Sequence, residues 1–272
     1  DAPYVRLVAL ENLGSYQVRQ GALWRAAETY RQAQALSTQP GGPSVQVTGV
    51  IEIALGEIYY EQNQLAQVTH LMPTAFQQLH QLLRGMEPGV TVRGYSLLAK
   101  TELALGNIAA AQSAMHEGEL FLARLPQPTP AVTALWAVHK TRLWLQQGDL
   151  LAANMAAASF QPAAHSELAC FQQLTMARLR VAQLQQQASP VWLTEATQLL
   201  ATALATAEEN TWVSQQIEGL VLQALLYRAT QQTAQALTTL RRALTLAQPA
   251  TYVRTFVDLG EAVTELLCQI QA

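Results

Sequence analysis

Charged side chains are scarce in this sequence, at 13% of its 272 residues, against about 25% in an average soluble domain. Lysine occurs only at Lys100 and Lys140. The sequence has 16 Lys and Arg residues and 19 Asp and Glu residues. A protein that binds nucleic acid directly needs clustered cations to neutralise phosphates. The net charge of −3 and the lack of a basic block therefore argue against direct nucleic-acid binding by this segment.

Cysteine and long apolar runs are scarce as well. Cys170 and Cys268 lie far apart, so a disulfide framework is not expected and the cytoplasm is the predicted location. No apolar stretch approaches the roughly 20 residues that span a bilayer, and no signal peptide is visible. We expect no membrane contact, and the start at Asp1-Ala2-Pro3 indicates a piece of a longer protein.

Catalytic and metal-binding motifs are missing too. The five histidines and two cysteines form no H-E-x-x-H or C-x-x-C pattern, and no serine has a G-x-S-x-G context. GYSLLAKT at 94–101 has the Lys-Thr of a phosphate loop, but it lacks the glycine before Lys100 and falls in a predicted helix. We therefore expect no catalytic residue, no metal and no cofactor, and we predict that the chain is not an enzyme.

What the sequence does contain is a repeat. GNIAAAQ at 106–112 and GDLLAAN at 148–154 share a turn residue, a small polar or acidic residue, an apolar residue and alanines. The turn residues Gly21, Asn63, Gly106 and Gly148 are spaced by 42, 43 and 42 residues. A fifth turn is expected within Leu184–Pro190, with Leu184 taken as its marker, and a sixth near Gln231.

Each repeat has the pattern of a helical hairpin. Before each marker, apolar residues recur at intervals of three and four, which is one face of a helix. Glycine or asparagine at the marker can take the left-handed conformation that ends a helix. A small residue follows at similar places in the second helix: Ala26, Ala111, Ala153, Ala196 and Ala236. Hairpins of this length bury their apolar faces by stacking. We predict an all-α fold, a right-handed α-solenoid superhelix of about six hairpins of roughly 40 residues each, in a single domain over 1–272.

Three segments carry resemblances to known families. LGEIYYEQNQLAQVTHLMPTA at 55–75 resembles the tetratricopeptide repeat, although the unit of 42 residues exceeds the usual ~34. LTMARLRVAQ at 174–183 and ALTTLRRALTLAQPATYVRTFVDLGEAVTELL at 236–267 resemble the end of the sensor domain of MalT-type activators. These activators are large ATP-dependent members of the LuxR family of bacterial transcription regulators.

The resemblance implies a function for the segment. In that family an NTPase module precedes the helical sensor, and a helix-turn-helix domain that binds DNA follows it. ATP and DNA would then bind only to modules that this segment lacks. The segment itself would bind a small-molecule inducer, a regulatory protein or both, and control ligand-dependent self-association of the full-length regulator.

The tetratricopeptide pattern also places a candidate groove site. Residues six before each marker should face the inner groove, and they are Ser15, Glu57, Lys100, Arg142 and Arg178. Three consecutive units thus carry a cation at one relative position, which predicts a basic ladder for an anionic small molecule, a carboxylate or an acidic peptide. Arg93 and His139 lie on neighbouring faces, and Tyr60 and Tyr95 could stack on a sugar or a ring.

Other interpretations of these residues remain open. Glu57, Glu61, Glu102 and Glu167 could neutralise the cations in salt bridges between repeats, and aromatics at helical spacing are often core residues. For the function, the alternative to an inducer sensor is a tetratricopeptide-type scaffold that binds only proteins. An enzyme is the third possibility, and it would require a closed polar pocket with a perturbed acid–base pair.

Overall fold

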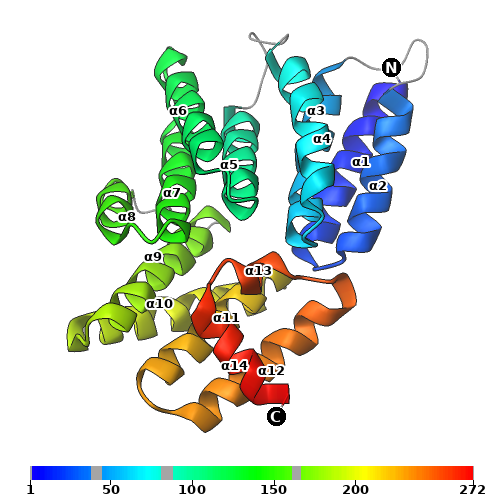
Figure 1. The fold of residues 1–272 in the computed structure, drawn as a ribbon. Helices are drawn as coiled ribbons and strands as arrows, with labels where there is room; N and C mark the ends of the chain where they lie inside the picture. The colour runs from blue at the N-terminus through cyan, green and yellow to red at the C-terminus, as the bar shows by residue number, and fades with distance from the viewer. Residues whose placement is uncertain (1, 38–44, 81–87, 161–166, 272) are drawn as a thin grey trace. The chain divides into compact units, whose positions relative to one another are not determined.

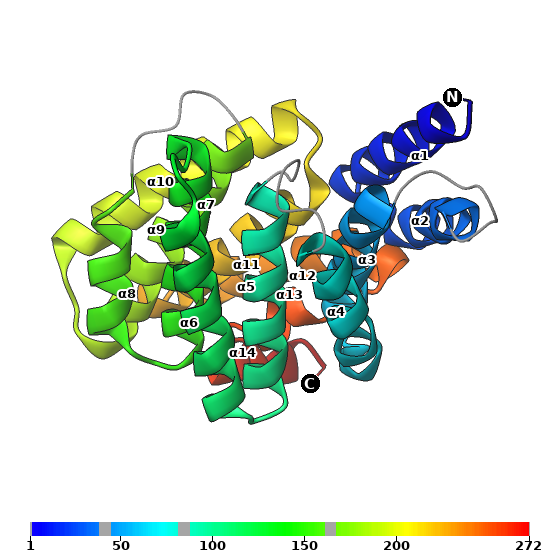
Figure 2. The same cartoon turned by 90° about the horizontal axis from the view of Figure 1, so that it is seen from above.

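The computed structural model describes residues 2–37, 45–80, 88–160 and 167–271, and every regular element in these ranges is helical (Figure 1). Six helical hairpins follow one another, and two further helices close the chain (Figure 2). The hairpins are α1 (Ala2–Arg19) with α2 (Leu23–Ser37), α3 (Val45–Glu61) with α4 (Leu65–His80), α5 (Pro88–Ala104) with α6 (Ile108–Arg124), α7 (Pro130–Gln146) with α8 (Leu150–Ala157), α9 (Glu167–Gln186) with α10 (Pro190–Glu209), and α11 (Val213–Ala229) with α12 (Thr233–Ala247). A 3-10 turn at Gln248–Ala250 leads to α13 (Arg254–Val257) and α14 (Glu261–Gln271).

The predicted fold class, an all-α array of tetratricopeptide-like hairpins, is confirmed. The chain forms two compact units, Asp1–Trp136 and Ala137–Ala272, and the boundary falls inside α7. In the first unit α1, α3 and α5 pack in succession, with α2 against α3 and α4 against α5. In the second, α9 and α10 pack against α11, and α14 packs against α11 and α12. The expectation of a single domain stays a prediction.

Residues in the left-handed backbone conformation end the first helix of the hairpins at the predicted markers. The φ angles there are positive: Gly21 72°, Asn63 60°, Gly106 82°, Gly148 76° and Gln231 60°. Each such turn closes with the paired backbone bonds that satisfy the last carbonyls of a helix. At Asn63, for example, the Asn63 amide donates to Tyr60 at 2.8 Å and the Gln64 amide donates to Tyr59 at 2.7 Å.

The prediction that Leu184 marks the fifth turn is wrong. Leu184 lies inside α9, which continues to Gln186, because the run of glutamines offers good helix formers and no glycine or asparagine to stop it. The turn comes later, where the Ser189 hydroxyl accepts from the Trp192 amide at 3.4 Å and Pro190 begins α10. A left-handed turn of the marker kind instead joins α10 to α11, at Thr211.

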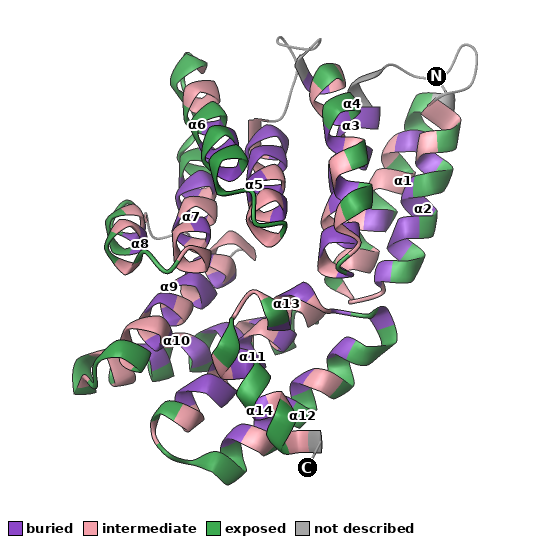
Figure 3. Ribbon diagram, viewed as in Figure 1, coloured by how far each residue is buried: buried purple, intermediate pink, exposed green. Residues whose placement is uncertain are grey.

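The small residues expected after each marker are confirmed as points of close contact between helices. All five are fully buried: Ala26, Ala111, Ala153, Ala196 and Ala236. The first helices α3 and α11 are buried along much of their length, because helices pack on several of their sides (Figure 3). No described helix is both long and apolar enough to cross a lipid bilayer.

One carboxylate lies inside the first unit. Glu52 of α3 is only 4% exposed, its Oε1 accepts from Gln34 Nε2 at 3.5 Å, and its Oε2 has no partner among the described residues. Burial raises the pKa of Glu52 above its ordinary value, and the hydrogen bond from Gln34 offsets only part of this. The folded state therefore holds this proton more tightly than the unfolded state does.

The Glu52→Gln variant should therefore be stabilised more at pH 7.5 than at pH 4.5. A raised pKa in the folded state means that stability falls as pH rises from the unfolded pKa, about 4.3, toward the folded pKa. The neutral amide removes this loss, so the difference in unfolding midpoint between variant and parent should grow with pH. Thermal unfolding followed by circular dichroism measures it, and an equal difference at both pH values would contradict the prediction.

The markers provide a matched pair of backbone substitutions. Gln231→Gly should raise the free energy of unfolding by roughly 0.5–1 kcal/mol, because glycine adopts positive φ without the Cβ strain of glutamine. Gly148→Ala should lower it by about 1 kcal/mol, and only because of the positive φ, since an added Cβ there meets no atom within 4 Å. Denaturant titrations test both, and effects of the same sign would be inconsistent with this reasoning.

Candidate functional site

Four predicted site residues of the first unit lie in one polar cluster on α3 and α5, which we call the Glu57 cluster (Glu57, Tyr60, Arg93 and Lys100). Arg93 holds the Glu57 carboxylate with two bonds, from Nε to Oε1 at 3.0 Å and from Nη2 to Oε2. The Lys100 Nζ lies 4.1 Å from the centre of the buried Tyr60 ring, a cation–π contact. The cluster thus joins two consecutive first helices of the array.

The charges in this cluster are tightly coupled. Burial by itself would raise the pKa of Glu57, but the positive charges of Arg93 and Lys100 outweigh it and hold the pKa below its ordinary value. Glu57 is therefore ionised at neutral pH. The pair is only partly buried, with 39% of the Arg93 side chain and 29% of the Glu57 side chain exposed, so an external group can approach it.

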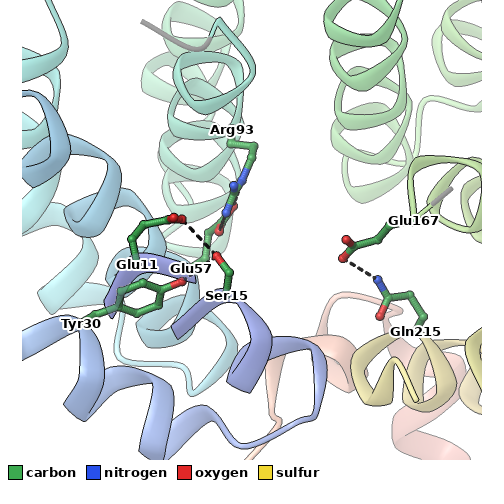
Figure 4. A network of polar contacts seen from close by, with 7 residues as sticks. All are labelled: Glu11, Ser15, Tyr30, Glu57, Arg93, Glu167 and Gln215. Carbon is green, nitrogen blue, oxygen red and sulfur yellow. Dashed lines mark hydrogen bonds and ion pairs between the residues drawn. The ribbon is translucent and has the colours of Figure 1, made fainter. Parts of the chain in front are cut away.

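Ser15, the first of the predicted groove positions, extends the polar contacts toward α1 and α2. Its hydroxyl donates to Glu11 Oε1 at 3.2 Å and lies 3.2 Å from the Tyr30 hydroxyl (Figure 4). Burial raises the pKa of Tyr30 to about 12, so this phenol is neutral at physiological pH. Ser15 and Tyr30 thus supply neutral hydrogen-bonding groups, whereas the charges lie on α3 and α5.

In the second unit, Arg142 bridges three successive first helices. Its Nε donates to Thr175 Oγ1 of α9 at 2.7 Å, and its Nη2 donates to Glu218 Oε2 of α11 at 3.0 Å. The guanidinium also lies 4.0 Å from the centre of the Phe171 ring. Only 17% of the Arg142 side chain and 12% of the Glu218 side chain are exposed, so this pair is much more buried than the Arg93–Glu57 pair.

The pKa of Arg142 reflects its burial. Burial lowers the pKa of its guanidinium, and the nearby Arg178 lowers it further, while Glu218 partly restores it. Arg178 itself donates from Nη2 to the Asp258 carbonyl at 2.5 Å. Both predicted groove cations of the second unit, Arg142 and Arg178, thus bind other parts of the chain. Lys100 lies in the first unit, and the three-residue ladder stays a prediction.

The remaining predicted site residues have mainly packing contacts. The His139 ring meets the edge of Phe171 at a centroid distance of 5.5 Å. Tyr95 does not face an open groove: it is buried in an apolar cluster with Val92, Val132 and Trp136, and its ring is 4.7 Å from that of Phe76. The sequence left open whether Tyr95 is a ligand or core residue, and its surroundings are those of a core residue.

Of the expected acidic partners, Glu57 binds a cation of the next repeat. Glu102 accepts from Asn107 at 2.8 Å, and Glu167 accepts from Gln215 at 3.4 Å (Figure 4). The partner of Arg142 is Glu218, which the sequence analysis missed. A signal was present, because Glu218 is the single acidic residue of the otherwise apolar or uncharged stretch before Arg228 in α11.

No described group of three or more His, Cys, Asp or Glu could hold a metal ion. Both cysteines are free thiols, with Cys170 buried and Cys268 exposed. Burial raises the pKa of Cys170 to about 11, which leaves it a protonated, unreactive thiol. A small pocket of about 260 Å³ opens between α10 and α11, and its lining is uncharged. Its lining residues are Leu193, Thr197, Leu200, Gln223, Leu226, Tyr227, Thr230 and Gln232.

The pattern of hairpins, markers and bridged first helices has a counterpart among known proteins. The MalT-like TPR region family matches residues 1–272. The chain belongs to this family. No curated protein matches it. Among solved structures, the crystal structure of the apo form of RapI aligns with a TM-score of 0.47 and 12% identity, over 97% of this chain and 72% of RapI. A likeness this distant carries no argument about function.

In this MalT-like TPR region, the segment YVRTFVDLGE at 252–261 has a structural role. Tyr252, Arg254 and Phe256 are buried, and the Arg254 guanidinium pairs with the Asp258 carboxylate. The Asp258 carbonyl accepts from Arg178 of α9, so the segment is fixed to the fifth hairpin, α9 with α10. These contacts hold α13 in place within the second unit.

The Arg142→Ala variant of the MalT-like TPR region should lose about 3 kcal/mol of unfolding free energy, because it leaves the Glu218 carboxylate buried without its cation. The double variant Arg142→Ala with Glu218→Ala should lose less, since no uncompensated charge remains. Arg241→Ala, at an exposed position of α12, is the control and should change stability little. Chemical denaturation measures all three, and equal losses in the first and third variants would argue against a structural role for Arg142.

Proposed function

We propose that this MalT-like TPR region is the effector-sensing domain of a LuxR-family, ATP-dependent bacterial transcription activator. We propose further that the Glu57 cluster binds the anionic part of the effector. The observation that carries the proposal is the cluster itself: a partly exposed group that holds two cations, Arg93 and Lys100, between two hairpins of a chain that has few charges. Family membership supports the regulatory role.

The cluster is suited to a carboxylate or phosphate. The two bonds from Arg93 to Glu57 and the contact of Lys100 with the Tyr60 ring hold both cations in place before any ligand arrives. A site whose charged groups are already ordered loses less conformational entropy on binding. An anion would approach the partly exposed Arg93 and Lys100, whereas the Tyr60 ring is buried beneath Lys100 and fixes its position.

Binding at this place would affect how the hairpins stack. Arg93 and Lys100 lie on α5, and Arg93 holds Glu57 of α3, so an anion that draws on Arg93 acts on a contact between two consecutive repeats. A ligand shifts a conformational equilibrium by its difference in affinity for the two states. We propose that this difference moves the full-length regulator from an inactive monomer to an active oligomer in the cytoplasm. ATP and DNA would bind to its other modules.

A tetratricopeptide-type protein-interaction scaffold is the second candidate. Leu151 and Met155 favour it, because they lie one turn apart on α8 and both are strongly exposed. Adjacent exposed apolar side chains are typical of protein-binding surfaces. The two candidates are compatible, since a regulatory protein and a small inducer can act on different faces of one array.

Lys100→Ala should weaken effector binding at least 10-fold, because a contact with a charged group contributes about 1.5–3 kcal/mol. The measurement is the thermal midpoint of the parent and the variant, titrated with sugar phosphates, nucleotides, organic acids and amino acids. A ligand that binds only the folded state raises the midpoint with its concentration. Lys140→Ala, which changes the only other lysine, is the control and should respond like the parent.

The outcomes separate the two candidates. A saturable shift in the parent and Lys140→Ala, reduced in Lys100→Ala, supports an anion-sensing site at the Glu57 cluster. If Lys100→Ala retains the full shift of the thermal midpoint, the ligand binds elsewhere, and this would contradict binding at the Glu57 cluster. A flat response to the whole panel would favour the scaffold, and binding of regulatory proteins to the full-length regulator would then be measured.

A further inference from the structure

Helix α1 carries an apolar stripe on its exposed side. Val5, Leu13 and Tyr16 are 65%, 46% and 58% exposed, and the exposed Ala9 lies between them. Their spacings of four, four and three residues place them on one face of the helix. Isolated apolar residues on a surface are ordinary, whereas a contiguous stripe indicates a binding surface.

The repeat register shows what covers this face elsewhere in the chain. Gly21 and Asn63 occupy the same place in consecutive hairpins, so Ala9, Leu13 and Tyr16 of α1 correspond to three residues of α3. These residues are Ile51, Leu55 and Ile58, which are 0%, 1% and 2% exposed. The same face is therefore closed one repeat later.

The preceding hairpin covers this face of α3. On α3, Gly56 faces Met72 of α4 and Leu97 of α5, so the residues on the other side of the helix face α1 and α2. Contact between Gln34 of α2 and Glu52 of α3 marks the same interface. The stripe of α1 is the corresponding surface of the α1–α2 hairpin, and it is exposed among the described residues.

The position of Ala9 in the repeat faces the preceding hairpin. Gly94 of α5 and Gly219 of α11 lie at the same distance before their markers, and a Cβ on them would lie 2.5 Å from Ile53 and 2.7 Å from Leu204 of the preceding hairpin. In α7 the same position holds Trp136, whose ring lies against Gly118 of α6. Ala9 is small, as the two glycines are, and leaves room for a helix to come near.

The last helix has the opposite character. The exposed residues of α14 are polar or small: Glu261, Thr264, Glu265, Cys268 and Gln269. Val263 and Leu266 point inward and are buried. An exposed apolar stripe is therefore not common to all helices of the array.

We propose that the α1 stripe (Val5, Ala9, Leu13 and Tyr16) is a docking surface for a further helical hairpin of the same repeat type. This hairpin is supplied by a partner segment and packs on α1 as α1 and α2 pack on α3. It presents aliphatic side chains to Leu13 and Tyr16, and one helix approaches closely at Ala9. The interaction continues the established interface between hairpins by one repeat.

A tandem extension tests the proposal on the full chain. Because the repeat is 42 residues long, a second copy of residues 1–42 placed ahead of Asp1 brings a hairpin of known sequence onto the stripe in register. Amide hydrogen exchange in the original α1 should slow by at least 10-fold relative to the unextended chain. Leu13→Gln with Tyr16→Gln in the original hairpin of the extended chain should abolish the slowing.

A matched control uses Trp24, which is also exposed but corresponds to the exposed Ala66 in the next hairpin. Trp24→Gln in the original hairpin should leave the slowing intact. Unchanged exchange in α1 of the extended chain would overturn the proposal. So would unfolding of the unextended chain by the Leu13→Gln and Tyr16→Gln pair, because the stripe would then be internal packing.

Sedimentation of the unextended chain distinguishes a second occupant. A monomer at all accessible concentrations is the expected result for a surface that binds a partner hairpin. A dimer that disappears in the Leu13→Gln and Tyr16→Gln variant would assign the stripe to a second copy of this chain and overturn the hairpin proposal. Neither readout depends on the effector, so the proposal can fail while the proposed function stands.

Discussion

Burial of the first helix of each hairpin under the hairpin before it is the interaction on which the rest of this structure depends. A pair of helices of this length cannot cover its own apolar faces, so each hairpin uses the next as part of its core. This is why α3 is buried along much of its length and why glycine occurs where α5 and α11 meet the preceding helices. Stability is therefore a property of the interfaces between hairpins as much as of each hairpin.

The same interfaces determine where charge can lie. First helices of consecutive repeats run side by side, so a long cationic side chain on one can reach an acid on the next. Arg93 reaches Glu57 in this way, and Arg142 reaches Thr175 and, one repeat further, Glu218. These pairs hold repeats at a fixed spacing and angle.

Local rules explain why much of the fold followed from the sequence. A left-handed turn needs a residue that tolerates positive φ, and Gly21, Gly106 and Gly148 show this directly in the sequence. The fully buried alanines are predictable for a similar reason, since they recur at a fixed distance from those turns. The fifth hairpin departs because its turn has no left-handed residue, so the helix of Leu184 ends where Ser189 and Pro190 start the next one.

The contacts of the site could not be predicted in the same way, because they join residues far apart in the chain. Arg142 and Glu218 are 76 residues apart, and Arg178 and Asp258 are 80 apart, so no local pattern links them. A cation six residues before a marker indicates the side of the helix on which it lies. Its partner depends on which acid the stacking of the repeats brings near it. Tyr95 shows the same limit, because helical spacing fits a core residue as well as an exposed one.

The Arg142–Glu218 and Arg93–Glu57 pairs differ in how far they are buried, and this difference decides what each pair can do. A ligand at the Arg142–Glu218 pair would have to displace a partner that is largely removed from water, and a single unpaired charge there is strongly unfavourable. The Arg93–Glu57 pair remains partly in contact with solvent, so an anion can join it without leaving a charge buried alone. Equivalent positions in one repeat can thus fix the array in one unit and be open to an effector in the other.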